Sequence, residues 1–174
     1  MIQKYSRYKI LQVFFDFPRK NFQIRELVRI VGISQPSVTN HIAELVKEGF
    51  VLKREEGIYP SYVANREFDK FKLYKKTNII HRIYSSGLLD FIYDSCVPSS
   101  VVLFGSCAKG EDIEESDVDI FVQASGKKLD LVKYEKILKR DINIFFEPDF
   151  SKLNKELKNN ILNGCLLKGY LKVF

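Results

Sequence analysis

Residues 101–122, VVLFGSCAKGEDIEESDVDIFV, combine two kinds of group that could bind a charged ligand. The small pair Gly105-Ser106 follows one apolar run, and two carboxylates, Asp117 and Asp119, alternate with apolar residues in the next run. Side chains two residues apart on a β-strand point to the same face, so the two carboxylates would lie side by side. Carboxylates so close repel each other and raise each other's pKa, and this cost predicts a compensating cation.

A divalent cation that bridges to phosphates would account for both halves of this pattern. Mg²⁺ prefers hard oxygen ligands and usually shares one or two carboxylates with the phosphates of a substrate. Glycine lets backbone N–H groups approach a phosphate closely, and Ser106 adds a hydroxyl donor. We therefore expect Asp117 and Asp119 to hold Mg²⁺, or Mn²⁺ in its place, next to a triphosphate bound at Gly105 and Ser106.

The same residues resemble the minimal nucleotidyltransferases of the DNA polymerase β superfamily. The signature of that family is an apolar residue, Gly-Ser, a spacer and Asp-x-Asp, and here residues 107–116 form the spacer. The family also favours Gly-Ser-x-Ala-Arg-Gly and Ser-Asp-x-Asp; this chain has Lys109 in place of the arginine and keeps Ser116. The resemblance implies that the nucleotide-binding residues are Gly105, Ser106, Lys109 and Ser116.

The family's reaction moves a nucleoside monophosphate, here expected to be AMP, from a triphosphate to a hydroxyl acceptor with two metal ions. Such a site usually takes a third carboxylate from the following strand. Here Asn143 stands at that position if residues 142–145 match the family's run. Asp141 lies about 6.6 Å away on the same face of the strand and is the alternative, and Glu147 is a more distant one. The predicted catalytic residues are thus Asp117, Asp119, Asp141 and Asn143.

The elements that would position these residues form an α/β pattern over residues 88–174. Short apolar runs predict strands at 101–104, 117–122 and 141–146. Helical spacing predicts helices at 129–140 and 153–162, the second one capped by Ser151. We expect a mixed sheet with flanking helices, as in the family.

Residues 1–65 have a different pattern. Apolar residues at helical spacing predict three helices, and two β-like runs around a glycine-containing turn predict a hairpin. These elements cover residues 5–17, 22–31, 35–49, 50–53 and 58–64. This order resembles the winged helix-turn-helix of MarR- and ArsR-like regulators. Residues 66–87 would be a helical connector, so the expected fold class is α+β or α/β with two domains.

The resemblance to winged-helix regulators implies a double-stranded DNA partner, with the third helix in the major groove. The side chains that could contact DNA are Gln35, Ser37, Thr39, Asn40, His41 and Lys47 on that helix, and Lys53 and Arg54 at the wing. The charge distribution agrees with a DNA partner, because residues 1–95 hold 16 Lys and Arg against 10 Asp and Glu, whereas residues 96–174 have no net charge. The alternatives are a solvated basic surface and a helix-turn-helix that contacts only protein.

Composition suits a globular chain of 174 residues, of which 45% are hydrophobic. No run approaches the ~18 apolar residues that span a bilayer, so we expect no membrane partner. The three cysteines, Cys96, Cys107 and Cys165, are far apart and odd in number, which is typical of reduced thiols and predicts a cytoplasmic protein. By analogy with other winged-helix proteins, we also expect a homodimer.

Two functions follow from these features. The first is a Mg²⁺-dependent nucleotidyltransferase with a DNA-binding arm and a protein or nucleic-acid acceptor. The second is a transcription regulator whose degenerate transferase domain senses a nucleotide. The choice depends on Asn143, because an amide can offer a neutral oxygen to a metal but cannot act as a carboxylate base.

Overall fold

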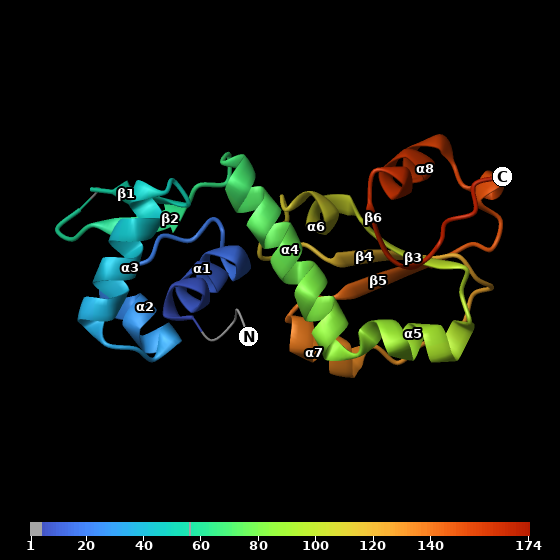
Figure 1. Cartoon of the computed structure of the whole chain (residues 1–174), viewed down its shortest axis with the longest axis horizontal. Coiled ribbons are helices and arrows are strands. Elements are labelled where there is room, and N and C mark those ends of the chain that lie inside the picture. Colours follow the sequence, from blue (N-terminus) through green and yellow to red (C-terminus); the bar gives the residue numbers. More distant parts are fainter. Residues whose placement is uncertain (1–4, 56) are drawn as a thin grey trace. The chain divides into compact units, whose positions relative to one another are not determined.

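The computed structural model describes residues 5–55 and 57–174 (Figure 1). The chain folds into two compact units, Met1–Lys75 and Lys76–Phe174. The predicted hairpin turn includes Glu56, which lies outside the described residues. The predicted connector, residues 66–87, is divided between the two units.

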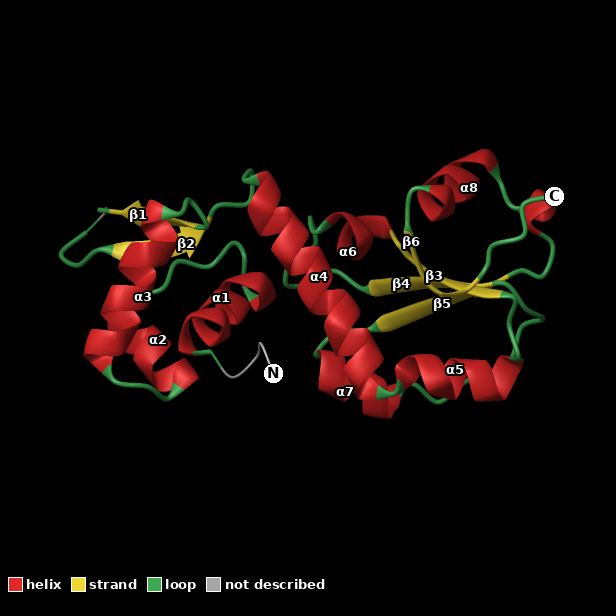
Figure 2. Ribbon diagram, viewed as in Figure 1, coloured by secondary structure: helices red, strands yellow, loops and turns green. Residues whose placement is uncertain are grey.

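The first unit contains three helices followed by a two-stranded antiparallel sheet, in the predicted order (Figure 2). The elements are α1 (Ser6–Asp16), α2 (Ile24–Val31), α3 (Gln35–Lys47), β1 (Val51–Arg54) and β2 (Ser61–Ala64). Gly32 ends α2 with a φ of 70°, a left-handed conformation that glycine adopts without a steric cost. The short link that follows leads directly into α3.

Aromatic and aliphatic side chains from all three helices fill the core of this unit. Phe14 is fully buried and packs edge to face against Phe22, with ring centroids 5.5 Å apart. Phe22 also bridges to Tyr62 of β2, which fixes the hairpin to the helices. Phe71, near the start of the next helix, closes the core by packing 5.2 Å from the Phe15 ring.

Two helices follow the hairpin, and the first of them lies within the predicted helical connector. They are α4 (Asp69–Ser86) and α5 (Leu88–Cys96). Gly87 separates them with a φ of 80°. The first residues of α4 belong to the first unit and the later ones to the second unit.

The second unit is built on a four-stranded mixed sheet with the order β5-β4-β3-β6. Its strands are β3 (Ser100–Phe104), β4 (Val118–Val122), β5 (Ile142–Phe146) and β6 (Cys165–Gly169). β4 and β5 run parallel, whereas β3 is antiparallel to both β4 and β6. The three predicted strands are confirmed, and β6 is an addition to them. The mixed sheet and its flanking helices agree with the expected fold class for this part of the chain.

Short helices connect the strands and cover the two sheet faces. They are α6 (Gly105–Lys109), α7 (Val132–Leu138), the 3-10 turn η2 (Phe150–Lys152) and α8 (Lys155–Leu162). One face, which includes Val101, Leu103 and Ile120, packs against α5, α7 and the end of α4. The other face, which includes Val102 and Phe121, packs against η2 and α8. Figure 2 shows α5 and α8 on opposite sides of the strands.

Two of the predicted helices in this unit have boundaries that are wrong. The helix predicted at 129–140 begins only at Val132 and ends at Leu138, because Lys139 takes a left-handed φ of 57°. Asn154, not Ser151, caps α8 by accepting a hydrogen bond of 2.8 Å from the Leu157 N–H. Ser151 instead donates from its N–H to the Asp149 carboxylate in the preceding 3-10 turn.

The helices in the described part of the chain are all too short or too polar to cross a membrane.

Candidate functional site

The two alternating carboxylates lie at the start of β4, on the sheet face that carries α8. Asp119 pairs with Phe104 of β3 on one side and with Asn143 of β5 on the other. Asp117 comes just before the strand, and both carboxylates are half-buried. The period of two along the strand places both of them on the face of Phe121, as the sequence predicted.

Gly105 lies directly against one of these carboxylates. A Cβ atom added to it would be 2.5 Å from Asp119 Oδ2, which is closer than any real contact of that kind. Its φ of 72° also favours glycine. Only a residue without a side chain lets the backbone approach Asp119 here. Gly105 begins the short helix α6, and Ser106, its second residue, is half-buried. Lys109 in the last turn of α6 is exposed.

The side chain of Asn143 joins the two carboxylates. Its Nδ2 donates to Asp117 Oδ2 at 2.9 Å and to Asp119 Oδ1 at 3.3 Å. The carboxylate oxygens therefore converge on one point, which the amide nitrogen occupies. Asn143 itself is exposed, so this point is open to solvent.

The environment of Asp119 disfavours its charged form. Burial raises the pKa of Asp119, the hydrogen bond from Asn143 opposes this rise, and the Asp117 charge adds to it. The net result is a raised pKa. A cation at the convergence point would have the opposite effect, because a nearby positive charge stabilises a carboxylate.

Asp141 takes a different position from the other predicted catalytic residues. Its backbone carbonyl accepts a 2.8 Å hydrogen bond from the Val118 N–H, and its side chain is exposed. Asp141 and Asp117 both line a cavity of about 430 Å³ formed with α7. Across residues 5–55 and 57–174, no group of three His, Cys, Asp or Glu side chains is arranged to hold a metal. The structure thus brings together Asp117, Asp119 and Asn143.

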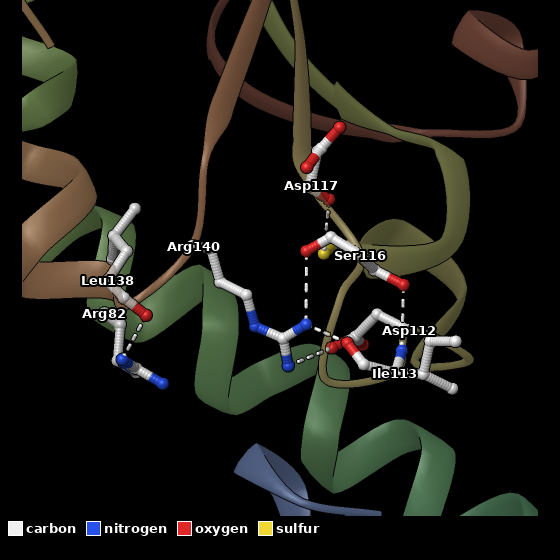
Figure 3. A network of polar contacts seen from close by, with 8 residues as sticks. Arg82, Asp112, Ile113, Ser116, Asp117, Leu138 and Arg140 are labelled. Atoms are coloured by element: carbon white, nitrogen blue, oxygen red, sulfur yellow. Dashed lines mark hydrogen bonds and ion pairs between the residues drawn. The ribbon is translucent and has the colours of Figure 1, made fainter.

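Arg140 clamps the loop that leads into β4 (Figure 3). Its guanidinium forms an ion pair with Asp112 at 3.1 Å, and both side chains are nearly fully buried. It also donates to the carbonyl oxygens of Ile113 and Ser116, the latter at 3.1 Å. Since Arg140 lies two residues before β5, one side chain connects the approaches to both strands that carry the site.

Ser116 takes part in the same loop. Its hydroxyl accepts a 2.9 Å hydrogen bond from the Ile113 N–H, so it stabilises the turn before Asp117. The Cys107 thiol donates to the Asp117 carbonyl oxygen at 3.3 Å from the side of α6. The backbone position of Asp117 is therefore fixed from both directions.

The residues predicted to contact DNA lie on α3 and at the end of β1. Four of them are exposed on the helix, namely Gln35, Thr39, Asn40 and Lys47. Ser37 is half-buried, and the Thr39 hydroxyl donates to the Gln35 carbonyl oxygen at 3.0 Å. Arg54 is exposed at the hairpin, where the Lys53 ammonium forms a 2.6 Å ion pair with Glu55.

His41 belongs to a different flank of α3. Its Nδ1 lies 3.4 Å from Glu44, which also pairs with Arg7 of α1 at 3.3 Å. Arg7 reaches Glu48 as well, at 2.8 Å. Glu44 of α3 and Glu48, the residue after its end, both pair with Arg7 of α1. Glu44 lies on the same flank of the helix as Asn40 and Lys47, four and three residues away from them.

Two residues near the carboxylates were not predicted from the sequence. The sequence pattern placed Arg140 at the end of a helix, whereas α7 ends at Leu138 and the left-handed Lys139 follows it, so Arg140 lies outside the helix. Phe145 looked like a strand residue, yet it is 43% exposed on the face of the carboxylates. The alternation of β5 could have indicated it, because Asn143 and Phe145 are two residues apart.

The family model described as Polymerase beta, Nucleotidyltransferase matches residues 88–171. The matched range includes Gly105, Asp117, Asp119 and Asn143. This part of the chain is therefore similar to a nucleotidyltransferase domain, and the similarity supports a nucleotidyltransferase-type function in general. No curated protein and no solved structure matches the chain.

Proposed function

We propose that the protein is a nucleotidyltransferase that moves a nucleoside monophosphate, AMP in the first instance, from a nucleoside triphosphate to a hydroxyl acceptor. The acceptor oxygen would form a bond to the α-phosphorus, the bond from that phosphorus to the β-phosphate oxygen would break, and pyrophosphate would leave. One observation carries the proposal: the carboxylates of Asp117 and Asp119 converge beside the backbone of Gly105, within a domain that matches the family model. The expected acceptor is a protein or a nucleic acid.

The donor set fits one Mg²⁺ or Mn²⁺ ion. Oxygens of Asp117 and Asp119 both lie within hydrogen-bond distance of a single Asn143 nitrogen, so one cation could contact both. The raised pKa of Asp119 agrees, since burial and the neighbouring Asp117 charge outweigh the hydrogen bond from Asn143. When bound, the ion would neutralise the carboxylates and stabilise charge on the phosphates.

The other residues would bind and orient the triphosphate. Gly105 has no side chain, so its backbone lies directly against the Asp119 carboxylate, and the half-buried Ser106 that follows it could donate its hydroxyl to a phosphate. Lys109 is exposed and positively charged, so it could reach a phosphate. Ser116 would act indirectly through the turn that positions Asp117.

Transfer of label from α-labelled triphosphates tests this function. The full-length protein would be incubated with Mg²⁺ and each triphosphate, with and without cell extract as a source of acceptor. Transfer should disappear in Asp119→Ala and persist in Asp94→Ala, which removes an exposed carboxylate of α5. The absence of transfer under all conditions would overturn the proposed reaction.

Asn143 favours a second function, a transcription regulator that senses a nucleotide through a degenerate transferase domain. The residue opposite Asp119 provides an amide where a third carboxylate would serve catalysis. In that case the protein would bind the triphosphate and change its DNA affinity without any transfer of label.

Both functions include a DNA-binding arm, which we place in residues 1–65 as a winged helix-turn-helix. The support is the order of three helices and a hairpin, together with the exposed polar flank of α3. We propose that α3 lies in the major groove and that Lys53 and Arg54 contact the backbone. A cytoplasmic homodimer on two half-sites would suit this arrangement.

A further inference from the structure

An exposed aromatic ring adjoins the carboxylates on the same sheet face. Phe145 is 43% exposed, although it lies within β5. It is two residues beyond Asn143, which corresponds to about 6.6 Å along the strand. Its ring packs edge to face with Phe104, with centroids 5.6 Å apart and an angle of 66° between the planes.

The surroundings of this ring define a boundary on the sheet face. Phe121, the register partner of Phe145 on β4, is fully buried beneath Phe150. Asp119 precedes Phe121 by two residues on β4 and faces the open point where its carboxylate and that of Asp117 converge. Phe145 therefore lies at the border between two parts of this sheet face. One part is covered by η2 and α8, and the other part carries the polar site.

From this position we propose that Phe145 is the platform on which the base of the bound nucleotide stacks. The inference rests on the proposed function and specifies the ligand as a complete nucleotide, recognised by its base as well as its phosphates. The two-residue rise of ~6.6 Å from Asn143 to Phe145 is the separation that the ribose between the base and its α-phosphate would bridge.

The edge-to-face contact with Phe104 prepares the ring for this role. Phe104 is buried and pairs with Asp119 across β3 and β4, so the same backbone supports the ring and the carboxylate. A ring held in one orientation loses little freedom when a base stacks on it. Aromatic stacking tolerates any base because each one has a π-face, so the platform supplies affinity without base selection.

The test compares ATP with inorganic tripolyphosphate, which has the phosphates but no base. Dissociation constants would be measured with Mg²⁺ for the full-length protein, Phe145→Leu and Phe145→Tyr. Leucine keeps an apolar side chain against Phe104, whereas tyrosine keeps the ring. Phe17→Ala is the matched control, because Phe17 is a phenylalanine of the other unit with 42% exposure.

We expect Phe145→Leu to weaken ATP binding about 5- to 100-fold and to leave tripolyphosphate binding unchanged. Phe145→Tyr and Phe17→Ala should bind ATP as the unmodified protein does. If Phe145→Leu loses affinity equally for ATP and tripolyphosphate, or loses affinity for neither, Phe145 is not a stacking platform. Neither result would contradict the proposed function. If the unmodified protein binds neither ligand, the proposed function fails and the platform fails with it.

Discussion

At the scale of single residues, Asn143 separates the two candidate functions. Its amide nitrogen occupies the point on which Asp117 and Asp119 converge, and its position is opposite Asp119 in the sheet register. An amide carries no charge, so its hydrogen bonds leave the charge of the two carboxylates in place. Replacing the amide by a carboxylate changes the charge of the site while it keeps the size of the side chain.

Asn143→Asp should strengthen Mg²⁺ binding and raise label transfer, both by about 10- to 100-fold, the range found when groups around a metal are altered. The reason is that a third carboxylate would join Asp117 and Asp119 at one point. Calorimetric titration with Mg²⁺ and the transfer assay would measure the two effects. Asn143→Leu, which has no ligand oxygen, is the control. Weaker Mg²⁺ binding in Asn143→Asp would contradict this expectation.

The raised pKa of Asp119 makes a second prediction at this scale. Burial, together with the Asp117 charge, makes the folded protein bind a proton at Asp119 more tightly than the unfolded chain does. Protonation of Asp119 should therefore increase the free energy of unfolding of the metal-free protein. The increase should develop as the pH falls through the raised pKa toward the ordinary pKa of an aspartate. Mg²⁺ affinity should fall over the same range, because the protonated carboxyl is a poor ligand.

Urea unfolding at a series of pH values, without Mg²⁺, would measure this contribution against Asp119→Asn. The variant should be the more stable of the two at neutral pH, and its advantage should shrink as the pH is lowered. Asp94→Asn, which changes an exposed carboxylate of α5, should show no such trend. An advantage that grows at lower pH would show that the sign of the Asp119 effect is reversed.

Some of these residues could be predicted from the sequence and others could not. The period of two placed Asp117 and Asp119 on one face, and Gly105 was selected because a backbone had to approach a ligand there. The direct approach of Gly105 to Asp119 was not predictable, because it depends on the antiparallel register of β3 and β4. The exposure of Phe145 likewise depends on where η2 and α8 end.

At the scale of elements, the site depends on the loop before β4. This loop belongs to no helix or strand, and Arg140 holds it through Asp112, Ile113 and Ser116. Arg140 can contact this loop because α7 ends two residues earlier, at Leu138. The sequence pattern favoured a longer helix there, since apolar spacing alone does not indicate a left-handed residue such as Lys139.

Arg140→Met should destabilise the second unit by about 3–5 kcal/mol, because it leaves the buried Asp112 carboxylate without its guanidinium partner. The double variant Arg140→Met with Asp112→Leu should recover much of this loss. Mg²⁺ binding should stay weak in the double variant, since the Ile113 and Ser116 carbonyls still lack the Arg140 donor. Chemical denaturation and Mg²⁺ titration would measure the two properties. Full recovery of Mg²⁺ binding would show that Arg140 does not position Asp117.

The hairpin of the first unit carries a prediction for DNA binding. Lys53→Ala with Arg54→Ala should weaken binding to duplex DNA and reduce the salt dependence by about 0.9 for each phosphate that the hairpin no longer neutralises. Glu55→Gln should strengthen binding, because Glu55 holds the Lys53 ammonium at 2.6 Å. Fluorescence anisotropy over a range of salt concentrations would measure both effects.

A matched control is the variant Lys127→Ala with Lys128→Ala, which removes the same charge from an exposed loop of the second unit. If this variant weakens binding as much as the change at the hairpin does, only the total charge matters and the hairpin does not bind DNA.

At the scale of the whole molecule, one helix contributes to both units. Phe71, near the start of α4, is part of the core of the first unit, and Ile79 and Ile83 are part of the core against the mixed sheet. The basic excess lies in residues 1–95, whereas residues 96–174 are neutral. The chain therefore separates an expected polyanion-binding part from an expected nucleotide-binding part and joins them through a continuous helix.

If the two ligands are coupled, the coupling must be reciprocal. Any factor by which ATP with Mg²⁺ changes the DNA dissociation constant must equal the factor by which DNA changes the ATP dissociation constant. We expect each ligand to change the dissociation constant of the other by about fivefold or more. Anisotropy would measure the constant for DNA, and calorimetry would measure the constant for ATP. Asp119→Asn should reduce the effect of ATP without altering DNA binding alone.

Breaking α4 between its two cores provides the decisive control. Thr77→Pro introduces a residue that disrupts a helix interior, whereas Thr77→Ala keeps the helix. Both variants should bind each ligand alone with ordinary affinity, and only Thr77→Pro should lose the mutual effect. If the mutual effect of ATP and DNA survives in Thr77→Pro, α4 does not transmit it. If ATP and DNA bind independently in the unmodified protein, the protein is not a regulator that senses the nucleotide.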